Sequence, residues 1–534
     1  MRRILALLLV SGLVIPGVFL RLRTVARADA SGATGDHFGN VSFPTSCSPQ
    51  AQPTIETGVA QLHSFQYQQA EASFTDASQA DPQCSMAYWG RAMALYHQLW
   101  DFPGAEALAK GHEYVAQAQK VGAKTDRERD YTAAAAAFFQ EGKKLSHTSR
   151  VEAYVAGMEK VHRDFPDDAE GAAFYALSVV NLAEHEDQLV NRKKAIAILD
   201  PLFVQHPDNP GVVHYLIHAA DTPELAPQGL AAARRYAQIA PDSSHALHMP
   251  SHIFLRLGLW QESIDSNIAA AASAAKATEA HQADATYQLH AMDFLNYSYL
   301  QSGQEGKARQ VLADLKLVPG ASADDLAEHE GWFASRDALE LHRWTEAASL
   351  PIPNIEISRV DATYLVRTIG AARSGDAKAA RANLKKLNEA LSAEHHEMKH
   401  MGYGGSFGPS IEQEQASAWV EFAEGKMDAA MKDLKAAAER QEAEGVDSLA
   451  MPAREMLGDM LLELKRPSEA LEAYRTALKR SPNRFDTLWG AAQAAQSIGD
   501  ASAAKNFYAK LVEVSGSGAD RPELQEARGY LASK

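Results

Sequence analysis

The stretch ELKRPSEALEAYRTALKRSPN, residues 463–483, decides the fold, because its apolar residues recur at the spacing of a helix. Ala470, Tyr474 and Ala477 follow one another at intervals of four and three residues, which places them on one helical face. Pro482 follows five residues after Ala477 and ends the pattern. The small residues at both ends of this ladder predict a helix that packs closely against a partner helix.

The same ladder recurs along the chain, so the unit is a repeat with a period of 34 residues. One period later it continues as Ala504, Tyr508 and Leu511. Other copies begin at Ala70, Ala195, Gly229, Ala308, Ala380 and Ala430. A glycine stands five residues before the first ladder position, where we expect the turn between two helices, at Gly258, Gly303, Gly375 and Gly425.

Leu457 and Gly458, 13 and 12 residues before Ala470, complete a pattern that resembles the tetratricopeptide repeat family over about residues 51–518. The resemblance implies an all-α solenoid of helical hairpins, wound as a right-handed superhelix, whose concave groove binds a protein or peptide. The segments DPQCSMAYWGRAMA, HALHMPSHIFLRLGLWQESIDSN and PAREMLGDMLLEL further resemble a group of exported bacterial tetratricopeptide proteins, which implies no particular reaction.

Residues 1–30 have the pattern of an export signal: two arginines, an apolar run from Ile4 to Leu20, and small residues at Ala28 and Ala30. Arg21, Arg23 and Arg27 are unusual so close to a cleavage site, so an uncleaved membrane anchor at residues 4–20 is the alternative. Both readings place the body outside the cytoplasm, in the periplasm or secreted. There Cys47 and Cys84 can pair or stay free.

We divide the rest of the chain into five parts: an extended linker at 31–50, an N-terminal repeat array with a histidine-rich groove at 51–320, central divergent hairpins at 321–440, a C-terminal repeat pair at 441–518 and a tail at 519–534. The formal net charge of −16 argues against nucleic acid as the partner. A membrane is expected only through the possible anchor.

Histidines gather where HYLIH (residues 214–218) and SHALHMPSH (residues 244–252) stand in consecutive repeats. In repeat numbering, six histidines and two aspartates take groove positions 2, 5, 9 and 12: His214, His218, Asp221, His245, His248, His252, His290 and Asp293. If like positions stack, His214, His248 and Asp293 form one rung, His218 and His252 another, and His245 and His290 a third.

Imidazole and carboxylate donors suit zinc, copper, nickel and iron, so we expect a divalent transition metal here, with zinc or copper first. A polar groove for an organic ligand or peptide, or a pH-sensitive surface, is the alternative. Pro250 removes a helical hydrogen bond, so we expect a kink or a late helix start that could turn His245 and His248 away from His252.

Two classes of function fit these residues, and metal storage or delivery is a third possibility. The first is an exported binding or scaffold protein with a metal or polar-ligand site in its groove. The second is a metal-dependent hydrolase or oxidase that uses the groove histidines, with Asp221 or Asp293 as an acid–base group, or less plausibly the HEMKH segment at 396–400. An enzyme predicts a closed pocket with an open coordination position, whereas a scaffold predicts histidines more than about 5 Å apart.

Overall fold

The computed structural model describes residues 37–99, 103–140, 145–183, 188–281, 283–400, 409–444 and 451–533, without the side chains of 183, 397–400 and 444. The expected export signal and anchor lie outside these residues. Every element in the described ranges is a helix. No helix there is both long and apolar enough to cross a membrane. By its internal contacts, the chain from His37 onward forms one compact unit.

Up to residue 220 the helices are α1 (Gln52–His63), α2 (Tyr67–Ala80), α3 (Ser85–Met93), α4 (Ala105–Val121), α5 (Asp126–Phe138), α6 (His147–Asp164), α7 (Ala169–Ala183), α8 (Gln188–Gln205) and α9 (Pro210–Ala220). The middle of the chain forms α10 (Ala226–Ile239), α11 (Ser244–His248), α12 (Pro250–Arg256), α13 (Trp260–Glu279), α14 (Thr286–Gln301), α15 (Glu305–Asp314), η1 (Leu315–Leu317), α16 (Ala323–Glu340), α17 (Trp344–Ser349) and η2 (Ile357–Arg359).

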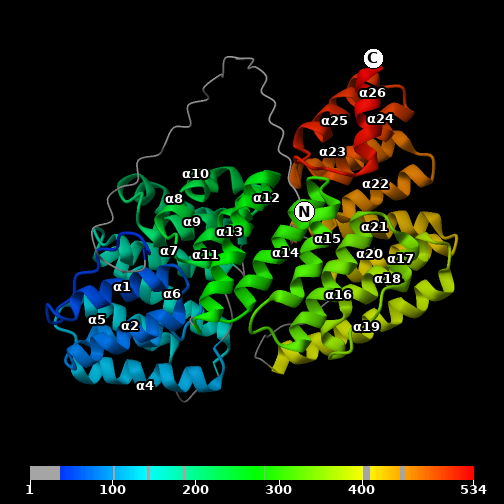
Figure 1. Cartoon of the computed structure of the whole chain (residues 1–534). Helices are drawn as coiled ribbons and strands as arrows, with labels where there is room; N and C mark the ends of the chain where they lie inside the picture. The colour runs from blue at the N-terminus through cyan, green and yellow to red at the C-terminus, as the bar shows by residue number, and fades with distance from the viewer. Residues whose placement is uncertain are drawn as a thin grey trace, which may run out of the picture. The chain divides into compact units, whose positions relative to one another are not determined.

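The rest forms α18 (Asp361–Arg373), α19 (Ala377–His400), α20 (Ile411–Ala423), α21 (Met427–Glu444), α22 (Ala453–Glu463), α23 (Pro467–Arg480), α24 (Phe485–Ser497), α25 (Ala501–Val514) and α26 (Pro522–Ala532). Helices adjacent in sequence pack on each other as hairpins, and each hairpin packs on the next, as α22, α23 and α24 do in Figure 1. This confirms the all-helical hairpin fold that the ladder predicts.

The ladder residues pack as their spacing requires. Ala470 and Tyr474 are fully buried on α23. A Cβ atom added at Gly458 of α22 would lie 2.6 Å from the Tyr474 ring, and one added at Gly490 of α24 would lie 2.4 Å from it. Because the ring fills the space between three helices, glycine is required on both sides. Phe74 lies in the same way between two glycines, Gly58 and Gly90, of α1 and α3.

The turns between paired helices also follow the prediction. All four expected glycines have a positive φ, between 64° and 82°: Gly258, Gly303, Gly375 and Gly425. Phe65 and Lys465 hold the equivalent position, five residues before a ladder, and have φ of 53° and 58°. The left-handed turn is therefore a property of the hairpin, which these two side chains adopt at some cost in backbone strain.

Three features complete the fold. Of the two alternatives for Cys47 and Cys84 the structure has the disulfide, which ties the segment before α1 to the start of α3. The stretch 519–534, expected to be a tail, contains α26, which packs against α25. The turn after α23 docks on the turn before α13, where the Trp260 indole donates to the Asn483 carbonyl at 2.9 Å. The C-terminal hairpins thus contact the middle of the chain directly.

Candidate metal centre

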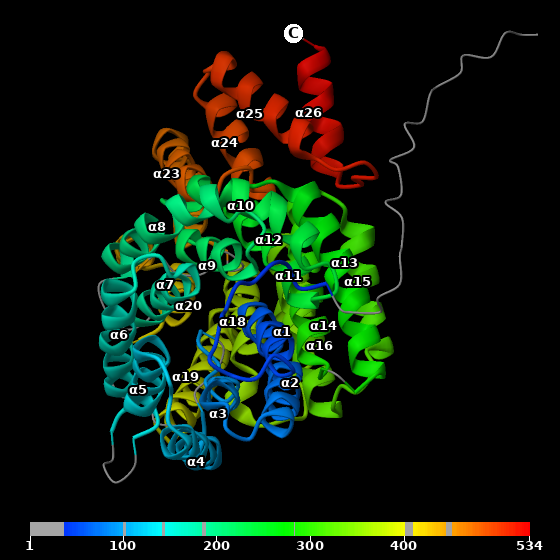
Figure 2. The ribbon, with the colours of Figure 1, turned by 90° about the vertical axis from the view of Figure 1, so that its left-hand side faces the viewer.

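Four helices bring the six predicted histidines together. His214 and His218 lie one turn apart on α9, which begins at Pro210. The side chain of Asn209 caps this helix by accepting a hydrogen bond from the Val212 amide at 3.0 Å. The other four histidines lie on α11, α12 and α14. Of these helices α12 packs on α9, as Figure 2 shows, and α11 packs on α12 and α14. Consecutive repeats therefore converge on one buried region.

Pro250 breaks the helix that carries the next three histidines, as its sequence position predicts. α11 ends at His248 and α12 begins at Pro250, with Met249 between them. The break separates His245 from His252 but leaves the Nε2 atoms of His248 and His252 3.0 Å apart. The kink therefore does not turn His248 away; it sends His245 to one group of side chains and His248 to another.

The histidines form two groups of three, and in each the potential ligand atoms all lie within 4.8 Å of one another. The first histidine group is His214, His218 and His245; the second histidine group is His248, His252 and His290. Each group takes positions 5 and 9 of one repeat and position 2 of the next. The predicted rungs of like positions are therefore wrong, because a side chain reaches diagonally across to the neighbouring hairpin.

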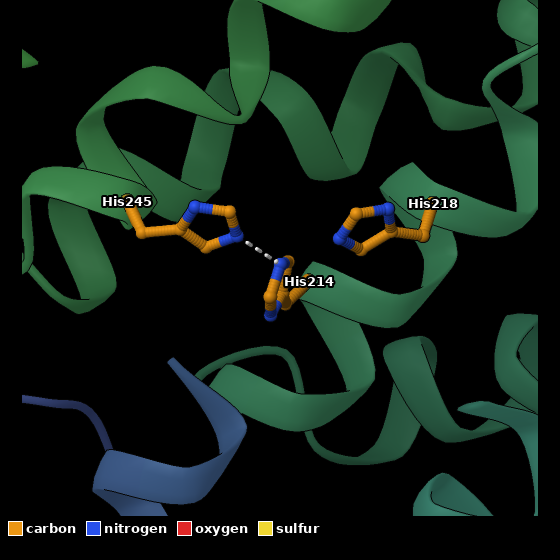
Figure 3. Close-up of side chains that lie close together, drawn as sticks. All are labelled: His214, His218 and His245. Atoms are coloured by element: carbon orange, nitrogen blue, oxygen red, sulfur yellow. Dashed lines mark hydrogen bonds between the residues drawn. The ribbon is translucent and has the colours of Figure 1, made fainter. Parts of the chain in front are cut away.

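The three rings of the first histidine group point toward a common centre in Figure 3. His214 Nε2 lies 3.0 Å from His245 Nε2, and His214 Nδ1 donates to the backbone carbonyl of His63 at 2.6 Å. His218 Nε2 is buried and has no hydrogen-bond partner among the described residues. Phe65 packs against all three rings, at centroid distances of 4.5 to 5.6 Å.

The second histidine group repeats this construction, with Phe294 against all three rings at 4.7 to 5.1 Å. Hydrogen bonds fix two of its rings. The Asn267 amide nitrogen donates to the Ser263 carbonyl at 2.8 Å, so its oxygen faces His248 Nδ1 at 2.7 Å. His248 Nδ1 must then be the donor, which leaves Nε2 without a proton in the neutral ring.

His252 is fixed by a carboxylate in the same way. Asp221 Oδ2 accepts from His252 Nδ1 at 2.9 Å, and Asp221 Oδ1 accepts from Arg256 at 2.9 Å. Neutral His252 therefore also presents a bare Nε2, and it faces the bare Nε2 of His248. Two lone pairs at this distance repel, so a cation must stand between them: a proton on one ring, balanced by Asp221, or a metal ion. Two nitrogens bound to one tetrahedral zinc lie about 3.3 Å apart, close to the spacing here.

Burial keeps most of these rings neutral. It lowers the pKa of His214 to about 3 and that of His290 to about 4. Burial, together with the neighbouring histidines, also lowers the pKa of the three remaining shifted rings well below the ordinary value: His218, His245 and His248. Neutral imidazole is the form that binds a metal, so the groups are ready to act as ligands at neutral pH.

The two predicted aspartates lie outside both groups. Burial would raise the pKa of the Asp221 carboxyl, but Arg256 and His252 hold it well below its ordinary value. Asp221 is thus an ionised partner of His252, the arrangement that orients many histidine ligands of metals. Asp293, one turn after His290, forms a buried ion pair with Arg336 at 2.6 Å. The Asp293 carboxylate therefore pairs with Arg336 and not with the grouped histidines.

Sequence reasoning missed His63 and Asn267. His63 is fully buried, and its two ring nitrogens contact Glu170 and Tyr215 at 2.8 Å each. A Cβ atom at Gly211 would lie 2.3 Å from His63, so glycine replaces the histidine found one repeat later at His245. The glycine at a position where the next repeat has histidine could have indicated that another side chain, His63, fills this space. Nothing in the sequence around Asn267 on α13 indicated its role.

The HEMKH segment ends α19, and its backbone is helical. The side chains of 397–400, His400 among them, lie outside the described part of the structure. Whether His396 and His400 could bind one metal ion is therefore not tested. At the two histidine groups His214, His245 and His248 are at most 3% exposed, whereas the other three histidines are half-buried.

The tetratricopeptide repeat family model matches residues 452–484. No curated protein matches the chain. Among solved structures, the human IFIT1 dimer with m7Gppp-AAAA is 14% identical with a TM-score of 0.34, over 89% of this chain and 92% of that one. The human IFIT1 dimer with PPP-AAAA is 13% identical with a TM-score of 0.32, over 86% and 89%.

The APC/C hetero-tetramer Cut9-Hcn1 is 12% identical with a TM-score of 0.32, over 90% of this chain and 89% of that one. All three TM-scores lie below 0.5, so these likenesses bear on neither partner nor activity. The family match falls on α22 and α23, the hairpin that holds Tyr474 between its glycines. The hairpin at residues 452–484 is therefore a tetratricopeptide repeat, and the chain is a protein that carries this repeat.

Proposed function

We propose that this chain is a metal-binding helical-repeat protein, in which the first and second histidine groups each hold a transition-metal ion, with zinc or copper the best fit. The observation that carries this proposal is the convergence, in each group, of three imidazoles that are buried or half-buried. Asn267 and Asp221 accept hydrogen bonds from Nδ1 of His248 and His252, respectively. The Nε2 atoms of the two rings face each other at 3.0 Å.

His218 supports the same proposal independently. A buried nitrogen without a hydrogen bond is costly, about 1 to 3 kcal/mol, and a metal ion at the centre of the group would remove that cost. The ligand set of each group is three neutral histidines. Such a set suits zinc, copper, nickel and iron, and it excludes the oxygen cages that calcium and magnesium prefer.

Elemental analysis of the untagged protein tests the proposal. We expect about two transition-metal ions per chain, and about one fewer in His248→Ala and in His218→Ala, because each variant removes one of three ligands. His206→Ala is the matched control, since His206 is exposed and outside both groups. Circular dichroism should show unchanged helicity in all three. Protein that stays metal-free even after incubation with zinc and with copper would refute the proposal.

A metal-dependent enzyme is the second candidate, and the number of ligands favours it. Three protein ligands leave one position of a tetrahedral ion for water or substrate, as in catalytic zinc sites. The burial of His214, His245 and His248 supports this candidate, because an enzyme requires a closed pocket. Assays of hydrolytic and oxidative chemistry on the metal-loaded protein, with the double variant His218→Ala, His248→Ala beside it, test this. Activity that survives in the double variant would place the chemistry outside the two histidine groups.

The tetratricopeptide repeat supports a further role in binding a protein or peptide, since such repeats generally mediate protein binding. We also propose export to the periplasm or the medium, with anchoring through residues 4–20 as the alternative. The Cys47–Cys84 disulfide supports an oxidising compartment. N-terminal sequencing of the protein from fractionated cells separates the two: a start near Ser31 in the soluble fraction favours cleavage, and an intact terminus in the membrane favours the anchor.

A further inference from the structure

A cavity of about 370 Å³ lies between α16, η2, α18, α19, α20 and α22, and none of the six grouped histidines lines it. Its volume falls in the range of pockets that enclose a small molecule. Leu339, Leu365, Val366 and Met456 form an apolar part of the wall, and Trp332 lies beside them. The cavity can therefore hold the carbon chain of a small organic ligand.

Carboxyl groups dominate the polar part of the wall. Arg359 and Arg336 also line the cavity, but their charges are already matched, by Asp325 and Glu328 for Arg359 and by Asp293 for Arg336. No described cation pairs with two other lining residues, Asp361 and Glu412.

Asp361 and Glu412 stand at the starts of α18 and α20, where a carboxylate often serves only as a helix cap. In α20 the cap is already supplied, because Ser410 accepts a hydrogen bond from the Gln413 amide at 3.1 Å. In α18 the Asp361 carboxylate itself accepts hydrogen bonds from its own backbone amide and from that of the following residue. Burial raises the pKa of Asp361 and outweighs these bonds, which lower it, and the charges of Glu412 and Glu328 add to the rise. These carboxyls therefore repel one another, and a cation placed among them would relieve the repulsion.

Two buried polar groups on the same wall lack partners. Ser335 is 1% exposed and Arg336 is 6% exposed. Neither Ser335 Oγ nor Arg336 Nη2 has a hydrogen-bond partner among the described residues. Polar atoms buried without a partner are uncommon, and a bound ligand is one way to satisfy them. Arg336 Nη2 offers a donor, so the ligand should carry an acceptor such as a carboxylate.

We propose that this cavity binds a small organic cation with a carboxylate or other acceptor at its far end, the chemistry of a basic amino acid. The ammonium or guanidinium group lies among Asp361 and Glu412. The carbon chain packs on the apolar wall, and the acceptor receives hydrogen bonds from Arg336 and Ser335. The same chemistry occurs in a free amino acid and in a lysine within a peptide, and the test separates these two sources.

Isothermal titration calorimetry on the full chain with L-lysine is the test. L-Norleucine differs from L-lysine only by lacking the side-chain ammonium, and 1,5-diaminopentane only by lacking the carboxylate. We expect L-lysine to bind at one site and L-norleucine to bind at least about tenfold more weakly, because the carboxyl groups lose their partner. Nα-acetyl-L-lysine N-methylamide stands for a lysine in a peptide; binding equal to that of L-lysine would point to a peptide source.

Variants of the wall locate the site. Asp361→Asn and Glu412→Gln should each weaken L-lysine at least about fivefold, whereas Glu330→Gln, an exposed residue of α16 outside the wall, should not change it. Ser335→Ala should lower affinity without lowering thermal stability, since the hydroxyl loses no bond in the free protein. Equal affinity for L-lysine and L-norleucine, wild-type affinity in both carboxyl variants, or no heat at about 10 mM ligand would overturn the proposal.

Discussion

The facing nitrogens of His248 and His252 owe their arrangement to side chains that belong to neither histidine group. Asn267 is turned by the Ser263 carbonyl, and Asp221 is kept ionised by Arg256. Each then accepts a hydrogen bond from the Nδ1–H of one ring, so in the neutral ring the opposite nitrogen, Nε2, carries no proton. Pairs of this kind set the tautomer and orientation of metal ligands in many proteins. At the scale of single residues, the centre therefore extends beyond the six histidines.

Replacing Asp221 measures that contribution. Asp221→Asn keeps the shape and one acceptor oxygen but removes the negative charge beside His252. We expect metal affinity to fall about 10- to 100-fold, the usual effect of losing such a partner. Competition with a chelator of known affinity measures this change. Asp76→Asn removes an exposed charge from α2 and serves as the control. Equal affinity in Asp221→Asn and wild type would mean that Asp221 only pairs with Arg256.

Asp337 gives a pH dependence of stability that does not involve the histidine groups. Burial raises its pKa to about 6, above the ordinary value of 3.8. Between these values the folded protein holds a proton that the unfolded chain releases, so Asp337 destabilises the fold at pH 7 and ceases to do so as the pH falls toward 4. Asp337→Asn should be about 1 to 3 kcal/mol more stable than wild type at pH 7 and equal near pH 4.

Urea unfolding at pH 7, 6, 5 and 4 measures this difference, and taking wild type against variant at each pH cancels the titration of all other groups. Asp324→Asn, on the exposed start of the same helix, should give no such trend. A stability gap between wild type and Asp337→Asn that does not change with pH would show that Asp337 is ionised in the folded protein throughout this range.

At the scale of elements, the hairpins were predictable because their signal is local. Ala470, Tyr474 and Ala477 lie within two helical turns, so their spacing alone identifies the packed face. Local spacing could not predict which histidines lie together in a group. The grouping depends on the helix break at Pro250 and on the rotation between neighbouring hairpins. That rotation brings positions 5 and 9 of one repeat close to position 2 of the next.

The same substitution, glycine to alanine, at two positions tests how tightly the helices pack. Gly490→Ala places a Cβ atom 2.4 Å from the Tyr474 ring, which cannot move away because Gly458 confines it from the other side. We expect a loss of about 1 to 3 kcal/mol of stability. Gly529 in α26 has no heavy atom within 4 Å of an added Cβ atom, so Gly529→Ala should gain about 0.5 to 1 kcal/mol. Urea unfolding compares the two variants, and equal effects would contradict the packing described for Tyr474.

At the scale of the whole molecule, residues far apart in sequence share one buried charge network. Arg484, at the start of α24, is fully buried and pairs with Glu340 of α16 and Glu455 of α22, each at 2.9 Å. It also donates to the hydroxyl of Tyr297 on α14. No local pattern could reveal this contact, because Arg484 and Glu340 are 144 residues apart. The repeat pattern predicts neighbours along the array and says nothing of one hairpin folding back on another.

Removing Arg484 should therefore destabilise more than its own hairpin. Burial already raises the pKa of Glu455, with Arg484 acting against that rise. Arg484→Met fills the same space but leaves Glu340 and Glu455 as unpaired buried carboxyls, which should cost about 3 to 5 kcal/mol. Arg480→Met breaks a more exposed pair with Glu224 and should cost less than about 1 kcal/mol. Urea unfolding compares the stability of the two variants, and limited proteolysis compares the cleavage rates of their C-terminal hairpins. If α22–α26 were docked only weakly on α14 and α16, Arg484→Met would lose no more stability than Arg480→Met. A several-fold larger loss in Arg484→Met, with faster proteolysis of α22–α26, means that this network holds the C-terminal hairpins in place.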